Sequence, residues 1–180
     1  MELVEQHPFL EQMLEEWAPA LGSARVAYGW HAYRVLNYAR ALLGSARHDE
    51  ELALAAAFHD LGIWSDRTFD YLPPSVERAE AFRRERAPGL GAELIASLIR
   101  NHHVLRPLRT GPDPAVQEAF RRADLVDVSR GQLRAGLPPR LVREVVERFP
   151  YAGFHGVLVR TAFAWAVRHP LRPLPMVRLC

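Results

Sequence analysis

The sequence has almost no cysteine, no long apolar run and no lysine. Its one cysteine is Cys180, which excludes an internal disulfide and suits a reducing, cytoplasmic location. No apolar run approaches the roughly 18 residues that a membrane-crossing helix needs, so we expect no membrane partner. The first residues include Glu2 and Glu5 but no base, which argues against a signal peptide.

An excess of charge of either sign is also lacking. The 23 basic residues, all of them arginine, face 21 acids, and the formal net charge is +2. Because Ala, Gly, Pro and Arg are plentiful together, we interpret the arginine as codon bias, although arginine is also the better bidentate binder of phosphate. So balanced a charge gives no strong nucleic-acid signal.

Helical periodicity is present along nearly the whole chain. The length suits one domain spanning residues 1–180, and about half of the residues are apolar, enough for a core. Apolar positions recur with helical spacing and no strand pattern is found, which predicts an all-α bundle of about seven or eight helices. The expected helices cover about 8–20, 23–43 with Ser23 as its cap, 49–62, 75–87, 90–103, 114–130, 138–148 and 152–168. Residues 65–74 and 106–114 are expected to be loops, and the tail from Pro170 to be extended.

The most informative residues are His59 and Asp60, which close the apolar stretch Ala-Ala-Ala-Phe-His-Asp-Leu-Gly. A carboxylate at the buried end of such a helix needs a partner. Imidazole with carboxylate is normal ligation for Zn, Fe, Mn or Co, so a divalent metal is a suitable partner. Gly62 would let the chain turn sharply after the pair.

Two further residues can complete a metal site. His31 lies in the middle of a predicted helix and 28 residues before His59, a separation that fits two antiparallel helices. Asp124 is an acid among apolar neighbours in Arg-Arg-Ala-Asp-Leu-Val-Asp, with Asp127 as a supporting or capping acid. Ligands from three packed helices would close one side of a metal and leave positions for water.

The order His, His-Asp and distant Asp resembles the HD superfamily of metal-dependent phosphohydrolases. The strings "AAAFHDLG" and "RRADLVD" are similar to its two helix motifs, and the resemblance covers about residues 25–130, with the helices of 138–168 expected to pack on this core. It implies an HD-type helical fold and a metal held by His31, His59, Asp60 and Asp124.

The pair His102-His103 bears on the number of metal ions. Binuclear members of the superfamily have two extra histidines between the His-Asp pair and the final Asp, but here residues 61–101 contain none. This departure favours one ion per chain, of Zn, Mn, Fe, Co or Ni, and argues against the di-iron oxygenase branch. His155 is a weaker candidate to reach the site from the last helix.

The resemblance implies metal-assisted hydrolysis, in which the metal lowers the pKa of a bound water and polarises the electrophile. Asp60 would bind the metal and orient the water, while His102 or His103 would stabilise negative charge or protonate the leaving group. The planar guanidinium of arginine can donate two parallel hydrogen bonds to phosphate oxygens. The candidate substrate-binding residues are therefore Arg67, Arg100 and Arg106.

Three functions stay open on these residues. The first is a phosphohydrolase acting on a nucleotide-like or small phosphate ester. The second is a cyanamide-hydratase-like lyase that hydrates a small nitrile at one metal. The third is a non-catalytic module that binds a ligand, against which the complete ligand set argues. The expected partner is a small molecule, and a homodimer is compatible with the sequence.

Overall fold

The computed structural model describes residues 2–178, so Cys180 lies outside the described residues. The helices are α1 (Pro8–Glu16), α2 (Ala18–Leu21), α3 (Arg25–Leu43), α4 (Asp49–Phe58), α5 (Gly62–Ser65), α6 (Leu72–Arg86), α7 (Ala92–Asn101), α8 (Pro114–Val128), α9 (Pro139–Arg148) and α10 (Phe154–Arg168), with a 3₁₀ turn at Gly22–Ala24. Within residues 2–178 no strand occurs, and the single parallel bridge joins Val104 to Arg178. The predicted all-α fold is confirmed, with eight helices of nine residues or more.

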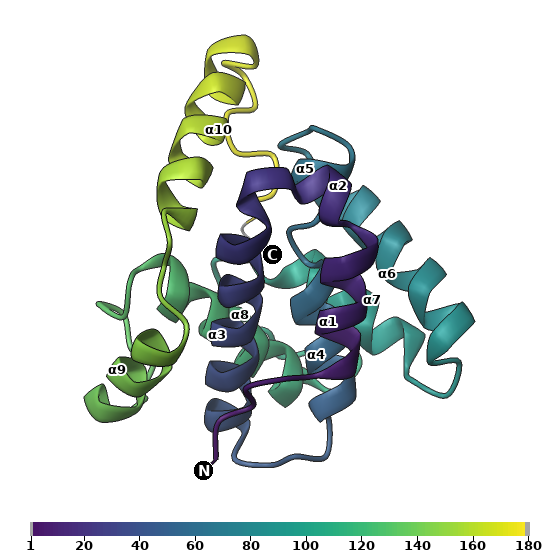
Figure 1. Cartoon of the computed structure of the whole chain (residues 1–180), viewed down its shortest axis with the longest axis vertical. Helices are drawn as coiled ribbons and strands as arrows, with labels where there is room; N and C mark the ends of the chain where they lie inside the picture. Colours follow the sequence, from purple (N-terminus) through teal and green to yellow (C-terminus); the bar gives the residue numbers. More distant parts are fainter. Residues whose placement is uncertain (1, 179–180) are drawn as a thin grey trace.

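The centre of the bundle is the pair α3 and α8, which make the most extensive contact between any two helices. Helix α4 packs between α3, α1 and α7, as Figure 1 shows. Every residue from Leu52 to Phe58 is buried, which fits a helix that is apolar on all sides. Helices α9 and α10 contact α3 on its other side, and α10 rises away from the body. Helices α3, α4, α7 and α8 therefore pack against one another inside the protein.

Several helix boundaries differ from the prediction. The first helix is interrupted at Trp17, and Pro19 opens the short α2, because a proline fits the first turn of a helix but not its interior. Ser23 does not cap α3, since it lies inside the 3₁₀ turn that precedes it. Helix α6 begins at Leu72 rather than Ser75, so the two prolines that follow form its first turn.

The chain also turns differently after the His-Asp pair. Helix α4 ends at Phe58, and residues 59–61 form a turn that leads directly into α5. A positive φ at Gly62 is not what makes this turn. A Cβ atom at Gly62 would lie 2.6 Å from the carbonyl oxygen of Tyr71, so the glycine is required by the close approach of the residue 71 backbone.

The C-terminal tail is not extended as predicted. After α10 it turns at residues 170–173 and runs back to the body, where the amide of Leu105 donates to the carbonyl of Arg178 (2.9 Å). The reason is apolar burial, because Met176 packs in a small cluster with Ile63, Phe69, Tyr71 and Leu72. None of the described helices has the length and apolar character required to cross a bilayer.

Candidate metal centre

Four helices bring their polar residues to one buried point. His31 comes from the middle of α3, His59 and Asp60 from the turn after α4, and Asp124 from α8. His102 follows directly after α7. All five residues are at least 97 % buried, although the helices that carry them are far apart in sequence. Burial of so many titratable groups at one place calls for a compensating charge.

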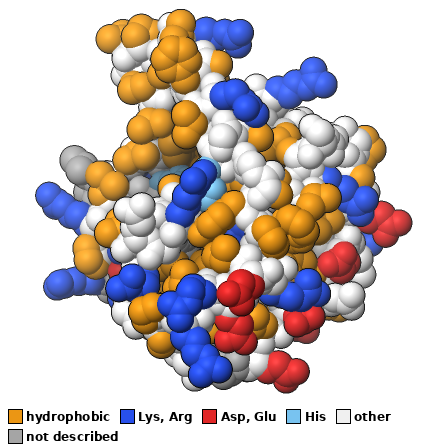
Figure 2. Space-filling model, turned by 60° about the vertical axis from the view of Figure 1, so that its left-hand side comes forward, with side chains coloured by type: hydrophobic (Ala, Val, Ile, Leu, Met, Phe, Trp, Pro, Cys, Tyr) orange, Lys and Arg blue, Asp and Glu red, His pale blue; other side chains and the backbone are white. Residues whose placement is uncertain are grey.

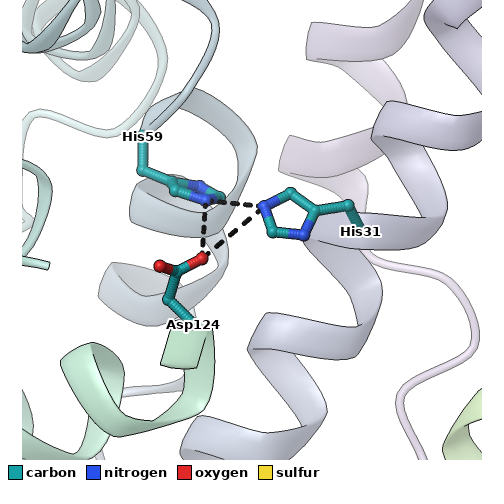
Figure 3. Close-up of side chains that lie close together, drawn as sticks. All are labelled: His31, His59 and Asp124. Carbon is teal, nitrogen blue, oxygen red and sulfur yellow. Dashed lines mark hydrogen bonds and ion pairs between the residues drawn. The ribbon is translucent and has the colours of Figure 1, made fainter. Parts of the chain in front are cut away.

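The ligand atoms of these residues converge closely. Figure 3 shows His31, His59 and Asp124 pointing toward one another from α3, α4 and α8. The Nε2 atoms of His31 and His59 are 2.9 Å apart, and they lie 3.8 and 3.7 Å from Oδ1 of Asp124. Oδ2 of Asp60 lies 3.5 Å from the His31 Nε2 atom and 3.6 Å from the His59 Nε2 atom. The four residues that the sequence predicted as metal ligands therefore surround one space.

His102 and His103 extend this cluster on one side. Nε2 of His102 lies 3.5 Å from Oδ1 of Asp60, and Nδ1 of His103 lies 3.6 Å from Oδ2 of Asp124. Three overlapping groups could hold a metal ion, with ligand atoms within 4.8 Å of one another: His31-His59-Asp124, His59-Asp60-His102 and His102-His103-Asp124. The sequence left it open whether His102 contacts the metal, and the structure places it among the possible ligands. The expectation of one ion per chain stays a prediction.

The hydrogen bonds on the far side of the imidazoles fix their tautomers. Nδ1 of His59 donates to the carbonyl of Ala56 (3.0 Å), and Nδ1 of His31 donates to Asp127 (2.6 Å). In their neutral forms both rings therefore direct an Nε2 lone pair into the shared space. Two lone pairs at 2.9 Å repel each other unless a proton or a metal ion lies against them. A divalent cation fits this pair of nitrogens.

The atoms without partners support the same conclusion. Asp60 Oδ1, Asp124 Oδ1 and His102 Nε2 are buried, and none has a hydrogen-bond partner among the described residues. Nδ1 of His102 donates to the carbonyl of Ile99 (2.7 Å), so its Nε2 atom is also a free acceptor. Unsatisfied buried acceptors that face one another are costly without a cation, and this donor set of imidazoles and carboxylates suits Zn, Fe, Mn, Co or Ni.

In the metal-free protein the cluster stays strongly polar. Burial raises the pKa of Asp124, but the nearby imidazole of His59 and the charges of His103 and His102 outweigh it and lower the pKa to about 2. Burial lowers the pKa of His31, but the hydrogen bond to Asp127 and the nearby carboxylate of Asp60 raise it to about 9. Burial, followed by the charge of His102, lowers the pKa of His103 to about 4. At neutral pH the metal-free site thus has ionised carboxylates, a protonated His31 and a neutral His103, and a metal ion would displace the proton of His31.

Asp127 holds His31 in place from behind. Its Oδ2 atom accepts from Nδ1 of His31 (2.6 Å), and its two oxygens accept from the guanidinium of Arg34 (2.5 and 3.0 Å). The Nη1 atom of Arg34 donates to the carbonyls of Phe149 (2.9 Å) and Pro150 (3.0 Å). Asp127 thus lies directly behind His31, where a supporting acid is expected, and Arg34 joins α3 and α8 to the segment before α10.

Replacing Asp127 by asparagine should weaken metal binding by about 10- to 100-fold, because His31 loses the carboxylate that orients its ring and raises its basicity. A competition titration against a chromophoric chelator measures this change. Asp66→Asn is the matched control, since Asp66 is an exposed acid bound to Ser65 and Arg78, and its variant should bind metal as the wild type does. Equal affinities for the two variants would contradict a supporting role for Asp127.

The predicted arginine clamps lie away from the ligand atoms. Arg67 lines a separate cavity of about 240 Å³ beside Trp165. Arg100 is exposed and lines another, of about 610 Å³, with Asp70. Arg106 is exposed in the loop before α8. None of these three residues lines the pocket beside Asp60 and His103. Adjacency in sequence to the site motifs did not bring the arginines to the site, because Arg67 and Arg106 lie on loops and Arg100 lies on the exposed side of α7.

Several residues that contact the candidate ligands or Asp127 were not predicted from the sequence, or were predicted only as weak candidates. The ring of Phe154 stacks on His31, with centroids 4.1 Å apart, and Nε2 of His155 donates to the backbone carbonyl of Asp127 (2.9 Å). Tyr71 contacts Nε2 of His103 through its hydroxyl group (2.7 Å). Tyr71 was recognisable as an aromatic residue of the loop after the His-Asp pair, whereas Phe154 and Arg34 carried no signal apart from ordinary helical periodicity.

Comparison with known proteins identifies the family of this chain. The HD domain, described by that name, matches residues 28–129, more than half of the chain. The chain therefore belongs to the HD-domain family, a metal-dependent, hydrolase-type superfamily. Comparison with curated proteins and with solved structures gave no match. The matched range holds all six candidate ligand residues and nearly coincides with the range of about 25–130 expected from the sequence.

Proposed function

We propose that this chain is a metal-dependent hydrolase that acts on a small phosphate ester. One observation carries the proposal: imidazole nitrogens and carboxylate oxygens with no other partner converge from four helices beside a pocket that opens to solvent. When bound, a divalent ion supplies Lewis acidity, which lowers the pKa of water and polarises the ester. Family membership supports hydrolysis as the reaction class.

The residues of the chain have separable tasks in this proposal. His31, His59, Asp60 and Asp124 hold the ion, and Asp60 also orients the attacking water through whichever oxygen the ion leaves free. His103 faces the pocket and is hydrogen-bonded to Tyr71, so this pair is placed to donate a hydrogen bond to the developing charge or the leaving oxygen. His102 is buried to 97 %, and its Nε2 atom faces Asp60, which favours a ligand role over proton transfer to the substrate.

The experiment is a turnover screen of the metal-loaded protein. Phosphate monoesters, cyclic nucleotides and p-nitrophenyl esters are assayed with Mn, Co, Ni or Zn, and we expect hydrolysis of small esters that a chelator abolishes and added metal restores. The control is His169→Ala, because this histidine stacks on Trp165 at the end of α10 and should leave turnover unchanged. A protein with less than about 0.3 metal per chain after loading would contradict any metalloenzyme function.

A second function is favoured by the composition of the pocket. No arginine lines the pocket that holds Asp60 and His103, whereas phosphate recognition normally uses such residues. A small neutral substrate such as a nitrile needs no cationic side chain, so a cyanamide-hydratase-like lyase is the alternative. Formation of urea from cyanamide without release of ammonia, together with no turnover of any ester, would favour it. Full metal loading without turnover in either assay would leave a ligand-binding module.

A further inference from the structure

The pocket beside the candidate metal centre has a polar end and an apolar end. Its volume is about 290 Å³, near the lower limit for ligand pockets. Asp60, Tyr71 and His103 form the polar end, where the metal ligands lie. The rest of the pocket extends beneath α10 and the returning C-terminal segment.

The apolar end is built by residues from distant parts of the chain. Leu158, Val159 and Ala162 face it from α10, and Leu174, Met176 and Val177 close it from the C-terminal segment. Met176 is buried, but Val159 is 68 % exposed and Leu174 is 49 % exposed, so the rim presents apolar surface to solvent. Figure 2 shows hydrophobic side chains concentrated on the protruding part of the molecule that α10 forms.

No charged side chain of the described residues 2–178 lines this end of the pocket. Among these residues the titratable ones that line the pocket are Asp60, His103 and Tyr71, and all three belong to the polar end. A charged group placed among Leu158, Ala162 and Met176 would lose hydration without gaining a partner. Apolar carbon would gain free energy there, since it would cover side chains that are now partly exposed to water.

We propose that the substrate has a short, uncharged alkyl or aryl group that occupies the apolar end of this pocket while its reacting group lies at the metal ligands. This inference rests on the proposed function for the reacting group, and it adds the substrate class. The polar end fixes the direction of binding, because only one end of the pocket offers ligand atoms. We therefore expect esters with an apolar group to be better substrates than nucleotides, whose remote parts are polar.

The test uses straight-chain hydroxamic acids from acetyl to octanoyl, titrated calorimetrically into the metal-loaded protein. The hydroxamate group chelates the metal, and the chain samples the pocket. We expect affinity to rise by up to about fourfold per added methylene until the pocket is filled. Affinity that is equal along the series, or no binding by any member, would overturn the proposal.

A matched pair of variants locates the effect. Ala162→Phe fills the pocket from α10, and Ala164→Phe adds the same ring on the same helix outside the pocket. The first should remove the chain-length dependence while acetohydroxamate binding and metal content stay unchanged, and the second should behave as the wild type. Equal effects of the two variants would overturn the proposal. So would a dimer, detected by sedimentation, that Ala162→Phe dissociates without changing hydroxamate affinity, because a second copy would then occupy the groove.

Hydroxamate binding and ester hydrolysis test the apolar pocket and the proposed function separately. Hydroxamate affinity requires the metal and the pocket but no turnover. Chain-length dependence without any ester hydrolysis would support the pocket and contradict the hydrolase. Ester hydrolysis with equal affinity along the series would support the hydrolase and contradict the pocket.

Discussion

Asp60→Ala should lose metal and activity together, with metal affinity reduced by more than about 100-fold. Removal of a residue that only supports a metal ligand costs about 10- to 100-fold, so removal of a direct ligand should cost more. Asp60 has both oxygens in the cluster, one toward His31 and His59 and the other toward His102. Metal analysis of the dialysed protein and a chelator competition measure the loss.

Two further variants of this chain serve as controls for Asp60→Ala. Asp70→Ala carries the same change in a nearby, partly exposed acid that pairs with Arg172, and it should keep full metal content. Asp60→Asn preserves the shape of the side chain, so it reports on the site even where the alanine variant folds poorly. Full metal occupancy in Asp60→Ala, with unchanged helical content by circular dichroism, would show that the metal binds elsewhere.

The largest stability loss is expected for Arg34→Met. Arg34 is completely buried, and its guanidinium donates hydrogen bonds to both oxygens of Asp127 and to two backbone carbonyls. Breaking a buried ion pair leaves the carboxylate of Asp127 with only His31 as a partner, which costs about 3–5 kcal/mol of the free energy of unfolding. For a domain of this size the loss lowers Tm by roughly 6–20 °C, measured by thermal denaturation.

The matched control lies on the same helix. Arg40 also pairs with an acid, Asp49 (2.9 Å), but both side chains are partly exposed. Water screens this pair, so Arg40→Met should cost about 0–1 kcal/mol. Arg34→Lys should fall between the two, because the ammonium keeps the charge but cannot donate to both oxygens and both carbonyls. A loss for Arg34→Met as small as that for Arg40→Met would contradict the importance of the buried pair.

The candidate site was largely predictable from local sequence. His59 and Asp60 end a helix that is apolar on every side, and a charged residue in such a place requires a partner wherever the helix packs. Periodicity put His31 and Asp124 on helices with buried faces, and the order of the four residues pointed to the HD family. The four residues converge in the structure, and their prediction depended on short-range properties, namely helical spacing and the cost of burying charge.

The sequence was less informative where residues meet across long separations. It placed Arg67, Arg100 and Arg106 near the site because they adjoin its motifs, but Arg67 and Arg100 line other cavities and Arg106 is exposed on a loop. It also gave no sign that Arg34, one arginine among many, is completely buried. Burial of Arg34 results from the packing of α3 against α8 and from carbonyls more than a hundred residues away.

By itself, then, the sequence determined the helical class and the residues able to hold a metal, because these follow from periodicity and residue chemistry. It indicated the family through the resemblance of its motifs. Only the tertiary structure showed that His102 lies among the possible ligand atoms and that Asp127 accepts a hydrogen bond from His31. It also decided that Leu158 of α10 and Met176 of the returning tail form an apolar pocket beside Asp60. Periodicity identifies the apolar face of a helix. Which other element covers that face depends on how all the helices pack together, and this is a property of the whole chain.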